Sequence, residues 1–530
     1  MKNATLATSG VLWKRETGPV KILLHWAKVN SVILVNAGSL VGTTAVTSAL
    51  GFVYWWLAAR QFSPEAVGLA SAAISAMTLL GTFGIVGLGT LLLGELPRQQ
   101  GKEASLISAA LILVGGVGGC LGIVFAAVAP HLSTDFRALG ASIEDIALFA
   151  LGVSLISITV VLDQALIGLL RGGLQLWRNA LFATVKLAAL FVASLWLSHV
   201  TGLTIYTTWT IGNAYSLVAL AGFAIAKRGW PGRNYLPQWG LLRKLGPEAL
   251  RHHALNLTLQ APALILPVLV TILLSATVNA WFYASWNLAS IANVISVAFA
   301  TTLYAASSAQ PTALAHKLRL TLVLSFMACV LANGVLLLGT QQVLGLFGHS
   351  YSQQAAWSLR ILALESFPFL IKNHYIVISR IRGRVAHTTL LTIATGFLEL
   401  GGSAIGARFG GLNGLSLGWF AAMCIEAAFM SRTVYKAARF VKTFPQVSSE
   451  QHSMEVQAIW LVDTFVLAAI KPSNVGTSTD MHKTHLQRNR STRYINNSRL
   501  RLKPTRLERL SQYEEGNDIH EQSEISIKFY

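Results

Sequence analysis

Long apolar stretches alternate with short polar connections along most of this chain. Twelve of the stretches reach the roughly 20 residues that a helix needs to cross a bilayer. They lie near residues 32–58, 66–93, 105–129, 146–170, 179–199, 203–226, 252–275, 278–304, 318–339, 359–379, 386–407 and 411–434. The pattern predicts an all-α polytopic membrane protein with about 12 transmembrane helices.

Composition agrees with the pattern. The chain of 530 residues is 53% hydrophobic and only 12% charged, whereas soluble domains carry about 25% charged residues. This excludes a soluble enzyme and a disordered protein. The three cysteines all lie in apolar stretches, which excludes a secreted disulfide scaffold, and no Cys/His spacing is typical of a zinc site. We therefore predict no metal and no cofactor.

The basic residues predict the orientation of the spans. With the N-terminus placed inside, the inside segments hold about 21 Lys and Arg and the outside segments hold 4. Cytoplasmic connections of membrane proteins carry such an excess of Lys and Arg. We expect both termini to be cytoplasmic. Most of the net charge of +19 therefore reports orientation and is weak evidence for an anionic ligand.

The longest connection inside the bundle, 227–251, divides the spans six and six. It predicts an N-lobe over 32–226 and a C-lobe over 252–434, preceded by a cytoplasmic segment, 1–31. The ends of the second and eighth spans share a Thr-Leu pair, Thr90-Leu91 and Thr302-Leu303. This weak repeat favours two pseudo-symmetric lobes.

Residues 435–530 form a predicted cytoplasmic tail that is largely disordered. Its apolar stretch at 456–470 is too short for a typical span, so we interpret it as an interfacial helix, with a thirteenth span as the alternative. A basic run follows at 483–509. It carries no nucleic-acid-binding motif, and we expect no nucleic-acid partner.

Short motifs in the first half resemble a known family. The first span ends in Ala59-Arg60, and a short turn leads to Pro64 and then to Gly68 near the start of the second span. The second span ends in Gly87-Leu88-Gly89, before a linker that contains Pro97. A further motif of the resemblance, Leu169-Leu170-Arg171, lies at the joint between the fourth and fifth spans. The chain resembles the polysaccharide flippase branch of the multidrug/oligosaccharidyl-lipid/polysaccharide exporter (MOP) superfamily.

The resemblance implies two six-helix lobes around a central cavity, and it also implies a function. Members of that branch carry a lipid-linked oligosaccharide, a polyprenyl-diphosphate glycan, from the inner to the outer leaflet of a bacterial inner membrane by alternating access. This transport serves the assembly of polysaccharide or lipopolysaccharide. Expected partners are the glycan substrate, membrane lipids, a polysaccharide polymerase and glycosyltransferases. We expect a transporter and no enzymatic activity.

Two other functions fit a polytopic chain. A multidrug/cation antiporter of the same superfamily needs carboxylates in one lobe for Na⁺ or H⁺, yet the first six spans hold only Asp163. A membrane-embedded glycan polymerase or glycosyltransferase typically has a large outer loop with catalytic charges. The outer connections here are short and poor in charge, so both alternatives are disfavoured.

Polar stripes along three spans are candidates for the lining of the cavity. His253, Asn256 and Gln260 share one face of the seventh span, with Arg251 just before them. The first span carries a milder stripe that includes Asn36 and Thr43. The alternative is hydrogen bonding between helices, worth about 0.6 kcal/mol for each bond.

The eighth span places Asn287 and Asn293 on a face that also carries aromatic residues. Aromatic rings beside amides suit sugars, since rings pack against sugar C–H groups and amides bond hydroxyl groups. The alternative is that Trp281, Tyr283 and Trp286 form an aromatic belt at the outer interface.

Charges embedded in spans are costly in lipid and therefore indicate function. We predict that some of Lys186, Arg251 and Lys372 bind the diphosphate, although Lys186 has the alternative of extending to the inner interface. Asp163 and Glu365 are candidates for ion coupling or structural pairing, with Lys186 as a candidate partner of Asp163. Glu399 and Glu426 are expected to be paired structural groups.

Overall fold

The computed structural model describes residues 31–97, 101–197, 201–226, 237, 239–309 and 314–439. These residues belong to one compact unit. The predicted N-terminal segment 1–31 lies outside the described residues except for Ser31, as do the stretch 456–470 and the tail from residue 440 onward.

Helices make up all the regular structure of the described residues. The first half contains α2 (Ser31–Gln61), α3 (Pro64–Gly84), α4 (Leu88–Glu95), α5 (Glu103–Leu132), the 3₁₀ turn η1 (Thr134–Leu139), α6 (Ile143–Gly168), α7 (Gly172–Trp196) and α8 (Gly202–Ala226). The second half contains α9 (Trp239–Leu273), α10 (Ala276–Ala309), α11 (Leu314–Leu338), α12 (Thr340–Gly345), α13 (His349–Gln354), α14 (Ala356–Leu364), α15 (Ser366–Ile381) and α16 (Val385–Arg439). Among the described residues, ten helices are long and apolar enough to cross a membrane.

Every one of the twelve predicted ranges coincides with helix, which confirms the fold class. The second span is broken into α3 and α4 by Val86 and Gly87, which both adopt positive φ. The tenth span is α14 followed by α15. Spans eleven and twelve are joined in α16 across a kink at Gly410 and Gly411, where the backbone leaves helical geometry. Glycine suits this kink because Gly411 has φ of 54°.

Two predicted boundaries differ from the structure. Helix α9 begins at Trp239, so the second part of the predicted loop 227–251 is helical. Helix α7 begins at Gly172, which moves Arg178 from a predicted inside connection into a buried position on a span. The shift of α7 has a physical reason: polar residues continue an apolar helix when other helices cover them, as they cover Gln175 and Arg178. A hydropathy pattern cannot show this coverage.

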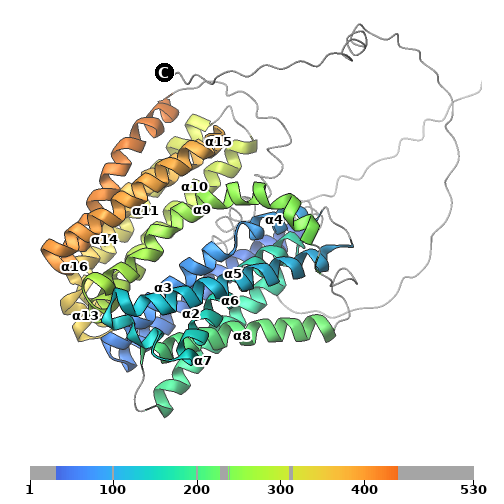
Figure 1. Cartoon of the computed structure of the whole chain (residues 1–530). Coiled ribbons are helices and arrows are strands. Elements are labelled where there is room, and N and C mark those ends of the chain that lie inside the picture. The colour runs from blue at the N-terminus through green and yellow to red at the C-terminus, as the bar shows by residue number, and fades with distance from the viewer. Residues whose placement is uncertain are drawn as a thin grey trace, which may run out of the picture. The chain divides into compact units, whose positions relative to one another are not determined.

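The helices pack in two groups that follow chain order (Figure 1). Helices α5 and α6 pack together, as do α2 with α7 and α7 with α8, whereas α10, α11, α15 and α16 pack among themselves. Helix α3 makes the main contacts between the groups, against α9 and α10. Large apolar side chains such as Leu195 and Phe409 are exposed on the outward faces, as expected for a protein surrounded by lipid.

Polar contacts join the two groups at the end where the outside connections are predicted. The Asn279 amide on α10 donates to the Gly68 carbonyl oxygen at 2.8 Å and to Ser71 Oγ at 2.9 Å, both on α3. The Ala276 N–H donates to Asp135 Oδ2 at 2.8 Å. Helix α3 approaches so closely that a Cβ atom on Gly68 would lie 1.6 Å from the Ala276 carbonyl oxygen. The structure is therefore closed at this end.

We expect Asn279→Ala to loosen this closure. It removes the donor from two buried acceptors, and an unsatisfied buried acceptor costs about 1–3 kcal/mol. The measurement is the distance distribution between spin labels at two exposed positions, Arg137 on η1 and Gln354 on α13, in a background without native cysteines. A population with longer distances should appear in the variant.

The matched control is Asn287→Ala on the same helix, because the Asn287 amide donates only to the Tyr283 carbonyl oxygen one turn away. Identical distance distributions in the two variants would show that Asn279 does not hold the closure.

Candidate functional site

Buried ionisable side chains mark the interior of both groups of helices. Among the described residues, the buried Arg, Lys and Glu side chains are Arg178, Lys186, Glu365, Lys372, Glu399 and Glu426, each at most 7% exposed. Burial of a charge is costly unless it is paired or hydrogen-bonded. The partners of these six residues therefore decide which charges are already neutralised and which remain available.

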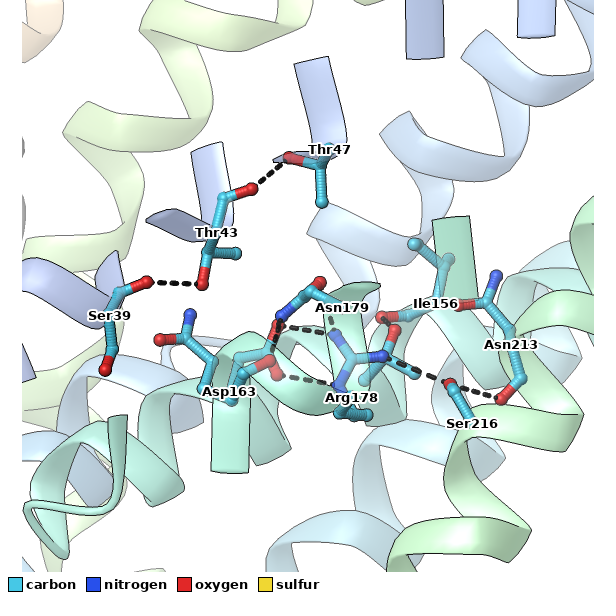
Figure 2. Close-up of polar contacts among 11 residues, drawn as sticks. Ser39, Thr43, Thr47, Ile156, Asp163, Arg178, Asn179, Asn213 and Ser216 are labelled. Atoms are coloured by element: carbon cyan, nitrogen blue, oxygen red, sulfur yellow. Dashed lines mark hydrogen bonds and ion pairs between the residues drawn. The ribbon is translucent and has the colours of Figure 1, made fainter. Parts of the chain in front are cut away.

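Arg178 forms a two-pronged ion pair with Asp163. Its Nη2 lies 2.6 Å from Asp163 Oδ2 and its Nε lies 2.8 Å from Oδ1. Asn179 bonds both partners, and Ser216 on α8 lies 3.4 Å from Nη1. Figure 2 shows Arg178 at the centre of this network, between α6, α7 and α8. The partner of Asp163 is thus Arg178 rather than Lys186, and the pair is neutral.

Lys186 lies on α7, about 12 Å along the helix from Arg178 at 1.5 Å for each residue. It does not extend to the inner interface, because aromatic rings enclose its ammonium group. Nζ lies 3.6 Å from the ring centre of Trp209, 4.7 Å from that of Phe182 and 5.1 Å from that of Tyr54. We call these four residues the Lys186 aromatic box. Ring faces attract cations, but they do not neutralise the charge.

No carboxylate of the described residues forms an ion pair with Lys186. The box is held in place by its own contacts: Tyr54 hydroxyl lies 2.7 Å from Thr208 Oγ1 and 3.1 Å from the Ile205 carbonyl oxygen. Tyr54 comes from α2, Phe182 and Lys186 from α7, and Trp209 from α8. Within its described part, the first group of helices therefore contains one buried cation without a buried anion beside it.

Lys372 has the opposite surroundings. Its Nζ donates to Glu399 Oε1 at 2.6 Å and to Glu426 Oε2 at 3.0 Å. Thr395 Oγ1 also donates to Glu426 Oε1, at 2.8 Å. Since the ammonium group already donates to two carboxyl groups, it is poorly placed to bind a diphosphate. Lys372 and the two glutamates come from α15 and from both segments of α16.

Glu365 lies at the junction of α14 and α15 and is buried, with the Asn293 amide 3.4 Å from its Oε1. Asn293 on α10 is therefore oriented toward a carboxyl group. Asn287, also predicted to line the cavity, donates to the backbone of its own helix.

The aromatic rings of α10 pack inside the bundle. Trp286 lies 5.2 Å from Trp419 of α16, and Tyr283 lies 4.7 Å from Trp55 of α2, centre to centre. The interpretation of these rings as a belt at the outer interface is therefore not supported, because they contact other helices rather than facing outward.

The predicted stripe on α9 splits in the structure. His253 Nε2 lies 2.9 Å from the Thr82 carbonyl oxygen on α3 and so joins the two groups of helices. Asn256 accepts a bond from Arg380 at 3.1 Å, and Gln260 is exposed. Only the backbone is described at Arg251 and Asn36. Thr43 is buried and donates to the Ser39 carbonyl oxygen on its own helix, at 2.8 Å.

Among the hollows of the described residues, two lie at the end of the bundle where the outside connections are predicted. One, of about 270 Å³, is lined by residues that include Trp281, Gln354 and Asn413. The other, of about 500 Å³, lies between α7 and α8 and is lined by residues that include Trp196 and Ile211. None of the six buried ionisable residues lines either hollow.

The sequence revealed the embedded charges but not their partners. Phe182 lies one turn from Lys186 on the same helix, and this spacing could have indicated one wall of the box. Tyr54 and Trp209 come from other spans and carry no such signal. Within the described part of the chain, no group of His, Cys, Asp or Glu is arranged to hold a metal ion.

The structure is similar to solved transporters. One is described as the inward-facing conformation of a multidrug resistance MATE family transporter of the MOP superfamily. It shares 15% identity with a TM-score of 0.58, over 75% of this chain and 98% of that one. Another is a MOP superfamily transporter from Pyrococcus furiosus with a binding pocket of reversed polarity, at 15% identity and a TM-score of 0.50, over 78% of this chain and 96% of that one.

At these identities the similarity shows the fold, which is that of MOP superfamily transporters. Comparison with curated proteins finds no match. The family model described as "Polysaccharide biosynthesis protein" matches residues 33–310, just over half of the chain. This match confirms the resemblance that the motifs of the first half indicated. The chain therefore belongs to the polysaccharide biosynthesis protein family and has the fold of MOP superfamily transporters.

Proposed function

We propose that this transporter moves a lipid-linked oligosaccharide, with a polyprenyl-diphosphate head, from the inner to the outer leaflet of a bacterial inner membrane. Both termini would be cytoplasmic. Glycosyltransferases on the inner face would supply the substrate, and a polymerase on the outer face would consume it. The observation that carries the proposal, beside the family membership, is the Lys186 aromatic box.

The box suits an anionic head group. A buried cation without a counterion retains its attraction for an anion, and this attraction is stronger in a medium of low dielectric constant than in water. The neighbouring ion pair of Asp163 and Arg178 is already neutral and competes less for phosphate. An arriving diphosphate would offset the cost of burying the Lys186 ammonium group. The first lobe should therefore bind anions more favourably than cations.

The closure of the outer end is the state from which export would begin. Asn279 and Asp135 join the two lobes there, so in this state a substrate would enter from the inner side. Outward release would require these contacts to break, as alternating access demands. The Lys186 box lies in the first lobe and the carboxyl-rich cluster lies in the second.

The direct test is a flipping assay with the full chain in proteoliposomes. A fluorescent polyprenyl-diphosphate glycan is loaded into both leaflets, and its accessibility to an enzyme outside the vesicles is followed. We expect the transporter to accelerate the exchange between leaflets. Efflux of a cationic dye under an ion gradient, with no exchange of the glycan lipid, would instead indicate a multidrug/cation antiporter.

We expect Lys186→Met to lower the flipping rate by about 10- to 100-fold. A hydrogen bond to a charged group is worth about 1.5–3 kcal/mol, and each 1.4 kcal/mol corresponds to a factor of ten. The folded protein should be as stable as the wild type or more stable, because the change removes an unpaired buried charge. The rate and the thermal unfolding temperature are measured on the same preparations.

Lys102→Met is the matched control, because Lys102 is an exposed lysine and the substitution is the same. A Lys186→Met variant that flips the glycan lipid at the wild-type rate would exclude the box as a phosphate site, whereas the family membership would stand.

A further inference from the structure

The second lobe contains a surplus of buried carboxyl groups. Within the described residues, Glu365, Glu399 and Glu426 lie there with at most 3% exposure, and Lys372 is the buried cation among them. If every group were ionised, negative charges would outnumber positive charges in this cluster.

Glu399, Lys372 and Glu426 form a connected triad. The ammonium bridges the two carboxyl groups through bonds of 2.6 and 3.0 Å. Its single positive charge can offset only one ionised carboxylate, and both carboxyl groups are 1% exposed.

Charge neutrality requires a proton on one of the two glutamates. Fully ionised, the triad would carry a net charge of −1 inside a lipid-embedded bundle, and an uncompensated buried charge is strongly unfavourable. Two carboxyl groups that share a site cannot readily both ionise. One proton makes the triad neutral, and Glu426 can still accept the bond that Thr395 donates.

We propose that Glu399 and Glu426 share one exchangeable proton, held by Lys372, and that this triad is the proton-binding site of the transporter. The proton moves between a carboxyl oxygen and water, and no other bond forms or breaks. The presence of the proton does not depend on the cargo. Its role as the coupling ion rests on the proposed transport function.

The position of the triad suits a coupling role. Glu399 and Glu426 lie on opposite sides of the kink at Gly410 and Gly411, and Lys372 lies on α15. Loss of the proton would place two adjacent negative charges across the two segments of α16 and push them apart. The proton thereby links the packing of three spans to the pH on the side to which the site opens.

Glu365, at the junction of α14 and α15, is the third buried carboxyl group in the described part of this lobe. Its uncharged neighbours include Asn293 on α10 and the indole of Trp419 on α16. Glu365 is itself a buried carboxyl group, so the test is made in a Glu365→Gln background to remove its own signal.

The test is infrared spectroscopy of the purified full chain near neutral pH, which detects the C=O stretch of a protonated carboxyl group. We expect the Glu365→Gln protein to show this band, with a shift in heavy water. Adding Glu399→Gln or Glu426→Gln should abolish it, because the remaining glutamate then forms a one-to-one ion pair with Lys372 and is ionised. The double variant Asp163→Asn/Arg178→Met is the control and should leave the band unchanged, since it removes a carboxyl group that forms an ion pair with Arg178.

A band that is absent before the substitutions, or that survives both of them, would overturn the proposal. Either glutamine variant suffices for the test if the other fails to fold. Coupling is read separately in the proteoliposomes: the flipping rate of the wild type should respond to an imposed pH gradient, and that of Glu399→Gln should not. If the substitutions abolish the infrared band but neither the wild type nor any variant flips the glycan lipid, the proposed cargo is refuted and the proton site stands.

Discussion

Arg178→Met should lower the free energy of unfolding by about 3–5 kcal/mol, as expected when one partner of a buried ion pair is removed. The arginine is 2% exposed and makes two bonds to Asp163, at 2.6 and 2.8 Å. Its loss leaves the Asp163 carboxylate with the Asn179 amide as its remaining donor among the described residues. A methionine fills much of the volume, so the loss reports charge rather than a cavity.

The double variant Asp163→Asn/Arg178→Met separates the two effects. Removing both charges eliminates the unpaired carboxylate, and we expect it to restore most of the stability, because replacing a buried pair by neutral groups is often close to neutral. Unfolding is followed in detergent by heat and by denaturant. Arg137→Met, at an exposed arginine, is the control. A loss below about 1 kcal/mol in the single variant, against the full value expected for a buried pair, would mean that water around the Asp163 side chain, which is 17% exposed, compensates for the lost arginine.

The second large effect is expected at the glycines where the two segments of α16 pack against each other. A Cβ atom on Gly406 would lie 2.0 Å from the Gly414 carbonyl oxygen, and one on Gly418 would lie 2.0 Å from that of Gly402. Small residues at such crossings let helix backbones approach one another within a membrane. Gly406→Ala must push the segments apart, and such overpacking costs about 1–3 kcal/mol.

Gly401→Ala is the matched control, since it lies on the same helix and a Cβ atom there meets nothing within 4 Å. Alanine is favoured over glycine in a helix by up to about 1 kcal/mol, so the control should be slightly more stable than the wild type. The thermal unfolding temperatures of the two variants should therefore move in opposite directions. Equal shifts would show that the segments of α16 do not pack as closely as described.

Local patterns predicted the spans well because the hydropathy of a segment is a property of that segment alone. All twelve ranges coincide with helices, and the motifs around Arg60, Gly68 and Gly89 indicated the family from residues that are neighbours along the chain. The boundaries of α7 and α9 were less accurate. The polar first turns of α7 are covered by other helices, and such coverage is not visible in a local pattern.

Partners of buried groups could not be predicted in the same way. Asp163 was expected to pair with Lys186 and instead bonds Arg178, because the rotation of α7 turns Arg178 toward α6 and Lys186 toward α2 and α8. Lys372 was predicted to be a phosphate ligand, but it lies between Glu399 and Glu426. The two glutamates belong to α16, whereas Lys372 belongs to α15.

The sequence by itself determined that this protein crosses the membrane, how its spans are ordered, which orientation to expect and which family it resembles. All of these follow from residues close together along the chain. Only the tertiary structure decided which charge is neutralised and which is not: Lys186 among aromatic rings, Arg178 on Asp163 and Lys372 between two glutamates. The reason is that Coulomb interactions act through space and depend on burial, and both distance and burial are set when helices far apart in sequence pack against one another.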